Sequence, residues 1–276
     1  MYFYRYPPLD KRDINLTFKE IRIPYSQLFH LNEVADLSKP KPHTMPTNEI
    51  FINHMKKMDI RKSDTIILYD RVNTFSSPRA FLTFKWFGHN NVRVLNGGFP
   101  RYQKLEGEIE KDDVFNVEKI NEYRKNNLPV KEDDFNYNLE TYRIYDIEKI
   151  YENKEDAVLI DARSEERYEG KVQEPRKSLR IGHVKGALNL FFKHLIDENG
   201  LYKSNDEIEK LFNNIGVNGD KPTIVYCGSG LTACIDLFAL ALLGKEKNLR
   251  LYDGSWFDYG NIPEEELNKL EEKFHK

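Results

Sequence analysis

The stretch Thr223-Ile-Val-Tyr-Cys-Gly-Ser-Gly-Leu-Thr232 decides the fold class, because it joins an apolar run to a glycine-rich loop and then to a helical pattern. Residues 223–226 are typical of a strand buried on both faces, and residues 231–243 of a buried helix. Similar compact runs occur at 65–69 and 157–160, and strand-like runs at 91–95 and 248–252 end near glycines. Strands that alternate with helices, such as the helix predicted over 77–87, indicate an α/β fold of parallel sheets flanked by helices.

The composition excludes several classes of protein. The 276 residues are 39 % hydrophobic and 13 % aromatic, which is enough apolar bulk for two domains. The net charge of −3, with both signs interspersed, argues against nucleic-acid binding driven by phosphate contacts. The longest apolar run, near residues 237–243, is too short to span a bilayer. We therefore expect a soluble intracellular protein without a nucleic-acid or membrane partner.

The chain also repeats itself. Tyr69-Asp70 precedes the run 91–98 by the interval that separates Tyr226-Cys227 from the run 248–255, and the offset between the copies is 157 residues. Two copies of one α/β unit are therefore predicted, as domains over 1–110 and 139–276. The polar stretch between them, 111–138, is predicted to be a linker with a short helix over 117–124. Asp70 stands where the second copy has Cys227, so only the second copy is predicted to be catalytic.

Cys227 opens the loop of the second copy. The two glycines that follow allow successive backbone N–H groups to point inward, and the next helix adds the positive end of its dipole. A cysteine in such a cradle is expected to be largely thiolate, and the N–H groups could stabilise an anionic sulfur adduct. Structural packing is the alternative, and it fits Cys234 better. A phosphatase would need an arginine at the position of Ala233.

The two cysteines are too few for a disulfide framework or a cysteine zinc site, so no metal is expected.

Cys227-Gly-Ser-Gly-Leu-Thr-Ala-Cys234 closely resembles the active-site loop of the 3-mercaptopyruvate sulfurtransferases, which belong to the tandem-rhodanese family. The resemblance covers nearly the whole chain and includes the motifs at 75–79, 87–89, 95–98, 159–164, 182–186 and 252–256. It implies two tandem rhodanese-like domains and a sulfurtransferase reaction. Sulfane sulfur would pass from 3-mercaptopyruvate through a Cys227 persulfide to a thiol acceptor or cyanide, releasing pyruvate without a cofactor.

The choice of sulfur donor leaves alternatives open. Thiosulfate-preferring relatives typically carry Arg and Lys within the loop, whereas this chain has Gly228 and Ser229, which favours 3-mercaptopyruvate. A thiosulfate-preferring sulfurtransferase (rhodanese) would use the same cysteine. A persulfide carrier or interaction module without turnover is the other alternative. Thioredoxin, another small thiol or cyanide would accept the sulfur.

The resemblance also assigns the site residues. Arg167 and Arg176 are expected to clamp the donor carboxylate, since a guanidinium binds a carboxylate in a planar, bidentate geometry. Ser229 and His43 are expected to assist proton transfer at Cys227. The remaining substrate-binding residues come from the loop and are Gly228, Gly230, Leu231 and Thr232.

The N-terminal part departs from the family in two respects. The aspartate that pairs with the family's histidine falls on Asn32, which can orient an imidazole but cannot stabilise its cation as a carboxylate would. Family members usually begin with a helix and a strand ahead of the segment that matches 2–26, which predicts a first domain shortened at its N-terminus. An upstream start is the other interpretation, and a mitochondrial presequence would then precede Met1. The expected location is therefore either cytoplasmic or mitochondrial.

Overall fold

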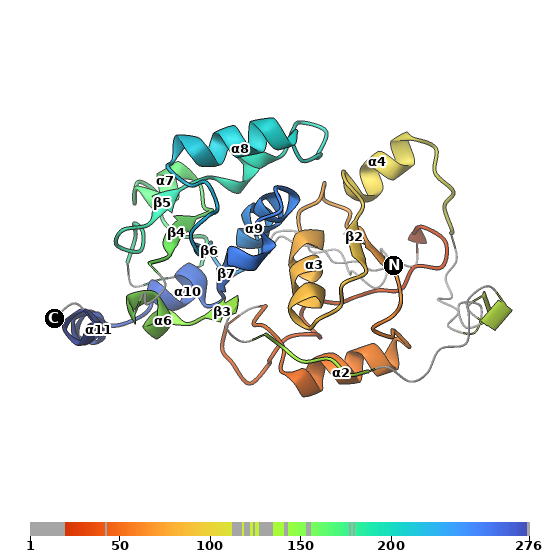
Figure 1. The fold of residues 1–276 in the computed structure, drawn as a ribbon, viewed down its shortest axis with the longest axis horizontal. Coiled ribbons are helices and arrows are strands. Elements are labelled where there is room, and N and C mark those ends of the chain that lie inside the picture. Colours follow the sequence, from red (N-terminus) through yellow and green to blue (C-terminus); the bar gives the residue numbers. More distant parts are fainter. Residues whose placement is uncertain are drawn as a thin grey trace. The chain divides into compact units, whose positions relative to one another are not determined.

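The computed structural model describes residues 20–41, 43–111, 118, 122–123, 125–126, 135–140, 143–152, 156–176, 178 and 180–274. The described residues form two compact units (Figure 1). Unit 1 falls within Met1–Val34, Pro46–Leu139 and Glu198–Leu201, and unit 2 within Ala35–Met45, Glu140–Asp197 and Tyr202–Lys276. Each unit has a parallel sheet and helices, which confirms the predicted α/β class. The boundaries 1–110, 111–138 and 139–276 stay predictions, and residues 35–45 are grouped with unit 2.

Unit 1 is built around two parallel strands, β1 (Ile66–Leu68) and β2 (Val92–Val94), with Ile66 opposite Val92. Its helices are α2 (Asn48–Lys57), α3 (Ser77–Trp86) and α4 (Gly98–Lys104). Aromatic side chains fill the space between α2 and α3. The rings of Phe51 and Phe87 stack with centroids 4.0 Å apart, and Phe84 packs edge-on against Phe51. Stacked and edge-on phenylalanine rings therefore join α2 to the end of α3 in the core of unit 1.

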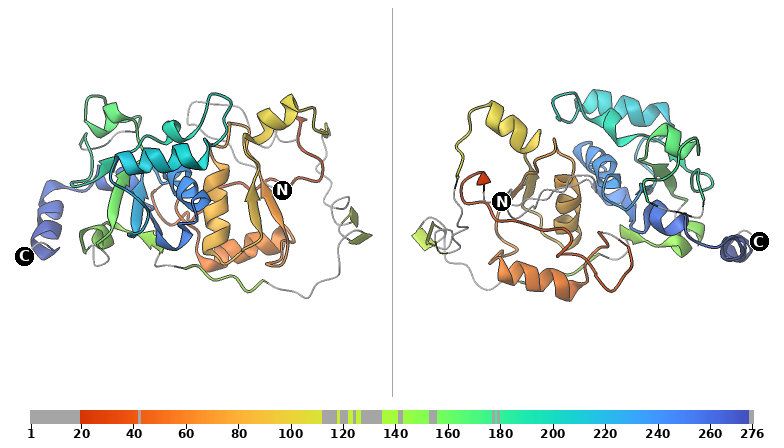
Figure 2. Two further views of the ribbon diagram at one scale, coloured as in Figure 1. Left: turned by 45° about the horizontal axis from the view of Figure 1, so that its top comes forward. Right: turned by 180° about the vertical axis from the view of Figure 1, so that it is seen from behind.

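Unit 2 contains a five-stranded parallel sheet with the order β3-β7-β6-β4-β5. Figure 2 gives two further views of the ribbon, in which the strands of this unit are drawn in green to blue. The strands are β3 (Ile144–Tyr145), β4 (Val158–Asp161), β5 (Leu188–Asn189), β6 (Thr223–Tyr226) and β7 (Leu249–Tyr252). Every residue of β6 and β7 is buried, as expected of inner strands of a parallel sheet. β6 lies at the centre, so the residue that follows it emerges in the middle of the sheet's carboxyl edge.

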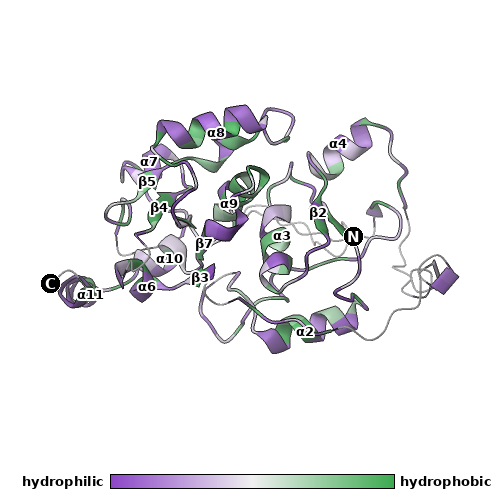
Figure 3. Ribbon diagram, in the orientation of Figure 1, coloured by the Kyte–Doolittle hydropathy of each residue, from purple (hydrophilic) through white to green (hydrophobic). Residues whose placement is uncertain are grey.

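The helices of unit 2 differ in polarity according to their place (Figure 3). α9 (Ala233–Leu242) is buried along nearly its whole length, whereas α8 (Asn205–Asn214) buries only Ile208 and Phe212. α8 begins with a capping box in which Ser204 and Glu207 exchange side-chain and backbone hydrogen bonds. The other helical segments are α6 (Ile147–Glu152), α7 (Glu165–Tyr168), η2 (Phe192–Leu195), η3 (Glu246–Asn248), α10 (Ser255–Tyr259) and α11 (Glu264–Phe274).

Two predictions fall on residues that are not described. Most of the short helix predicted over 117–124, and the N-terminal end at which the first domain was predicted to be shortened, lie outside the described residues. In the part of the chain that is described, no helix is long and apolar enough to cross a membrane.

Candidate active site

Cys227 follows the central strand β6 directly, at the edge where parallel sheets commonly bind ligands. Cys227 is 2 % exposed. The segment after β7 holds its backbone, because the Cys227 N–H donates to Ser255 Oγ at 3.2 Å and the Cys227 carbonyl accepts from the Trp256 N–H at 2.9 Å. The Phe257 N–H donates to the Gly228 carbonyl at 3.0 Å. The start of α10 therefore fixes the first two residues of the loop.

Ser255 makes this clamp from an unusual backbone conformation. Its φ is 52°, in the left-handed region that a side chain rarely adopts. Its hydroxyl donates to the Tyr252 carbonyl at 2.9 Å while it accepts from Cys227. The sequence analysis included Ser255 only as part of a motif, and the structure places its hydroxyl within hydrogen-bond distance of the Cys227 backbone.

The loop between Cys227 and α9 contains a glycine with a positive φ. Gly230 has a φ of 78°, which a glycine adopts without strain. The Cys234 N–H donates to the Leu231 carbonyl at 3.2 Å, and α9 begins at Ala233 with Thr232 as its N-cap residue. Ser229 and Leu231 are buried. The loop thus leads straight into the positive end of α9.

Arg167, in the last turn of α7, lies against this loop. A Cβ atom placed on Gly228 would be 3.0 Å from Arg167 Nη2, so the guanidinium occupies the space beside the residue after Cys227. Arg167 donates through Nε and Nη2 to the two carboxylate oxygens of Glu174, at 2.9 and 2.5 Å. Arg176 is half-buried, two residues after Glu174.

Glu174 also joins Arg167 to a buried ion pair. Arg163 donates through Nη1 to Glu174 Oε1 at 2.8 Å and through Nη2 to Asp161 Oδ2 at 2.5 Å. Burial alone would lower the pKa of Arg163, but the hydrogen bonds to Asp161 and the nearby charges raise it overall. Arg163 therefore stays charged, and its ring contact with Trp256, 4.1 Å from the indole centroid, ties the network to α10.

His43 belongs to unit 2, in a segment, residues 35–45, that we call the strap. Asp253 accepts from the Met45 N–H at 2.8 Å, and Lys41 Nζ lies 2.7 Å from Asp258 Oδ2. His43 is 7 % exposed and has a φ of 58°. α10 carries Asp258 and also binds the Cys227 backbone, so one short helix contacts both the strap and the loop.

Asn32, the residue predicted to stand at the family's aspartate position, is exposed and belongs to unit 1.

Asp236 is a buried carboxylate that the sequence analysis did not identify as a candidate site residue. It lies in the first turn of α9, is fully buried, and apart from its own backbone N–H neither oxygen has a hydrogen-bond partner within the described part of the chain. Burial raises the pKa of Asp236 well above its usual range, and the nearby charges of Cys227 and Asp161 raise it further. The signal was a single acidic residue within the apolar run 231–243.

In unit 1 the corresponding loop carries Asp70 in place of the cysteine. The carboxylate of Asp70 accepts N–H bonds from Val72 at 3.0 Å and from Ser76 and Ser77 at 2.8 Å each. Asp70 is fully buried. Its side chain thus occupies the ring of N–H groups that an anionic ligand would need, which gives a physical reason for the asymmetry between the two copies.

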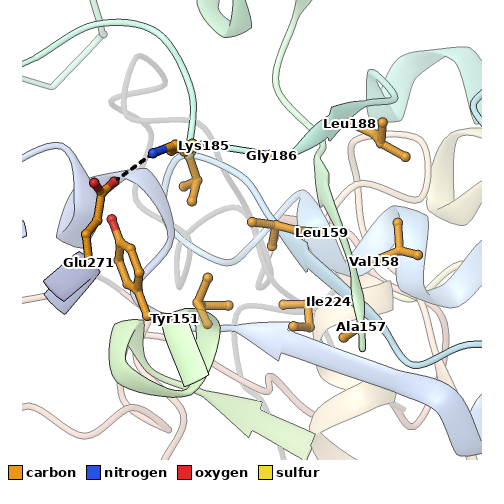
Figure 4. Close-up of a pocket in the computed structure, with 11 residues that line it drawn as sticks. Tyr151, Ala157, Val158, Leu159, Lys185, Gly186, Leu188, Ile224 and Glu271 are labelled. Carbon is orange, nitrogen blue, oxygen red and sulfur yellow. Dashed lines mark hydrogen bonds and ion pairs between the residues drawn. The ribbon is translucent and has the colours of Figure 1, made fainter. Parts of the chain in front are cut away.

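The cavity in Figure 4 lies elsewhere in unit 2. It encloses about 580 Å³ and is lined mostly by apolar residues, with Lys185 and Glu271 3.5 Å apart at its side. None of the predicted site residues lines it. Among the residues that the structure describes, no group of three or more His, Cys, Asp or Glu side chains is arranged to hold a metal ion.

Two α/β units that share one motif pattern, with a nucleophilic residue in the second alone, define a tandem-domain protein with one cysteine centre. Comparison with known families agrees: residues 8–105 and 146–261 both match the rhodanese-like domain. The chain therefore belongs to the rhodanese-like family, in its tandem-domain form, as the motifs predicted.

Individual relatives point the same way. The chain is 35 % identical to a 3-mercaptopyruvate sulfurtransferase of Escherichia coli O157:H7, over 95 % of this chain and 89 % of that protein. It is 30 % identical to an Arabidopsis thaliana protein named thiosulfate/3-mercaptopyruvate sulfurtransferase 1, mitochondrial, over 96 % and 72 %. The crystal structure of SseA from Escherichia coli, a 3-mercaptopyruvate sulfurtransferase, matches with a TM-score of 0.76 and 32 % identity, over 92 % and 91 % of the two chains.

Proposed function

We propose that this protein is a sulfurtransferase that moves sulfur from 3-mercaptopyruvate to a thiol acceptor or cyanide through a persulfide on Cys227. The observation that carries the proposal is the placement of Cys227 at the end of the central strand, in a loop that opens at the N-terminus of α9. The relatives named for this reaction support the choice of donor.

The proposed reaction begins with the Cys227 thiolate. The thiolate attacks the thiol sulfur of 3-mercaptopyruvate, so a sulfur–sulfur bond forms and the donor's carbon–sulfur bond breaks. The electron pair of the broken bond leaves with carbon as the enolate of pyruvate, and a proton on that carbon completes pyruvate. Ser229 and His43 are proposed to move this proton, and Gly228, Gly230, Leu231 and Thr232 to form the wall around the persulfide.

Arg167 and Arg176 are proposed to hold the donor's carboxylate. The contact between Arg167 and the Gly228 position supports this role, because it places a guanidinium beside the nucleophile's neighbour. In the second half-reaction an acceptor thiolate, of thioredoxin or a small thiol, attacks the outer sulfur and regenerates Cys227. Cyanide takes the sulfur in the same way and leaves as thiocyanate.

Thiosulfate is the second candidate donor, because the Arabidopsis relative is named for both donors. Purified protein given each donor with cyanide separates the two. The proposal expects a kcat/KM for 3-mercaptopyruvate well above that for thiosulfate. A preference for thiosulfate would reverse the choice of donor. A stable persulfide without turnover would instead indicate a carrier.

A cytoplasmic or mitochondrial location is part of the proposal. The Arabidopsis relative, named as mitochondrial, supports the second compartment. Cell fractionation with a tagged full-length chain tests it, and a secreted protein would contradict it.

A further inference from the structure

Glu174 is the feature of the candidate site that neither the motifs nor the proposed reaction explains. Its side chain is 6 % exposed and contacts two arginines at once, Arg163 at 2.8 Å and Arg167 at 2.9 and 2.5 Å. A carboxylate this buried is retained only where cations compensate it. Here one of those cations is the arginine that faces the Cys227 loop.

The charges of this cluster cancel. Arg163 is fully buried and bound on one side by Asp161 and on the other by Glu174. Arg167, 24 % exposed, is bound bidentately by Glu174. The two guanidinium groups and two carboxylates of this cluster therefore carry no net charge, and Arg167, one of the two arginines expected to bind the donor carboxylate, belongs to it.

The loop supplies no cation of its own. Residues 228–232 contain neither Lys nor Arg, and the space beside Gly228 is filled by the Arg167 guanidinium, 3.0 Å from where a Cβ would stand. A side chain at this position would require the Arg167 guanidinium to shift by a few tenths of an ångström. The positive charge near Cys227 is consequently smaller than the number of arginines suggests.

We propose that Glu174 is a specificity-determining residue, which neutralises Arg167 and thereby favours a singly charged carboxylate donor over a doubly charged one such as thiosulfate. This inference rests on the proposed function and deepens its choice of donor. The physical reason is that a unit of positive charge near the loop attracts a dianion twice as strongly as a monoanion at the same distance. A carboxylate that cancels this charge therefore weakens the binding of a dianion more than the binding of a monoanion.

The test is Glu174→Gln, which keeps the shape of the side chain and an acceptor oxygen while removing the charge. We expect the ratio of kcat/KM for thiosulfate to kcat/KM for 3-mercaptopyruvate to rise about tenfold in this variant. The reason is that the second negative charge of thiosulfate then gains a partly screened attraction to Arg167. The rise should shrink as ionic strength increases. Glu169→Gln is the matched control, because Glu169 is exposed, pairs only with Lys171 among the contacts described, and lies on the same segment. Its ratio should not change.

An equal loss of activity with both donors in E174Q would show that Glu174 merely supports the structure, and it would overturn the inference. An unchanged ratio would also overturn it. If the wild-type protein turns over neither donor, the proposed function fails instead, and the two failures are thus distinguishable.

A second measurement probes the charge near Cys227 without a sulfur donor. Cys227 of the wild-type protein and of E174Q is alkylated with iodoacetate, an anion, and with iodoacetamide, which is neutral. Because Arg176 is the same in both proteins, a compensated Arg167 predicts that the ratio of the iodoacetate rate to the iodoacetamide rate is at least about threefold higher in E174Q than in the wild type. An equal ratio in the two proteins would overturn the inference.

Discussion

Replacing Asp236 by asparagine should stabilise the folded protein, and by an amount that grows with pH. Burial holds the pKa of Asp236 well above the value of 3.8 that it has in an unfolded chain. Above pH 3.8 the Asp236 carboxyl loses its proton in the unfolded chain but keeps it in the folded protein. The folded state then binds more protons, so its stability falls as pH rises until the folded pKa is reached. An asparagine at this position has no titrating proton, so the D236N protein lacks this dependence.

The magnitude follows from the linkage slope. Each pH unit over which the folded carboxyl stays protonated widens the difference between variant and wild type by about 1.4 kcal/mol. Between pH 5 and pH 7 the difference should therefore grow by up to about 3 kcal/mol. Below pH 4 the two proteins should converge, because the carboxyl is then neutral in both states.

Urea unfolding at half-unit pH steps, followed by circular dichroism, measures this difference. Glu209→Gln is the matched control, because Glu209 is exposed on α8 and its loss should leave the pH dependence unchanged. Parallel stability curves for D236N and wild type, or a D236N protein less stable at pH 7, would refute a buried neutral carboxyl at this place.

Two further predictions concern the two loops. Asp70→Ala leaves the three N–H groups that Asp70 binds without an acceptor and should lower the free energy of unfolding by about 3 kcal/mol. A loss of less than about 1 kcal/mol in urea unfolding would contradict the stabilising role of these hydrogen bonds. Ser255→Ala and Ser255→Gly both remove the acceptor of the Cys227 N–H and should slow turnover about tenfold. The glycine variant should be the more stable of the two, because glycine adopts the positive φ of this position without strain. Unchanged turnover in both variants would show that the clamp is not needed.

Local patterns predicted much of the fold. The strand predicted over 223–226 is β6, and those predicted over 65–69 and 91–95 contain β1 and β2. The helix predicted over 77–87 is α3, one residue shorter. The buried type of strand predicted for both 223–226 and 65–69 holds for β6, whereas Ile67 in the middle of β1 is 40 % exposed. Short apolar runs bounded by turn residues therefore define where strands lie, but not whether both of their faces are covered.

The contacts that build the site could not be read in this way. The strap joins unit 2 through Met45 and Asp253, which are 208 residues apart in the chain, and no periodicity reports such a pairing. Glu174 looks like any acidic residue of a polar segment until the fold brings Arg163 and Arg167 to it. The roles of Cys227, Ser229, His43, Arg167 and Arg176, and those of the loop residues, stay predictions.

The most direct test of the account is the mass of the peptide that carries Cys227 after the protein has been incubated with 3-mercaptopyruvate alone. We expect the mass of one additional sulfur atom on Cys227, an equal amount of pyruvate, and loss of the added mass when a thiol acceptor follows. Cys234→Ala should behave in the same way, since Cys234 is a buried helix residue whose thiol donates a hydrogen bond to the Gly230 carbonyl. Pyruvate formation at the wild-type rate by Cys227→Ala, or sulfur on Cys234 instead, would contradict the central claim.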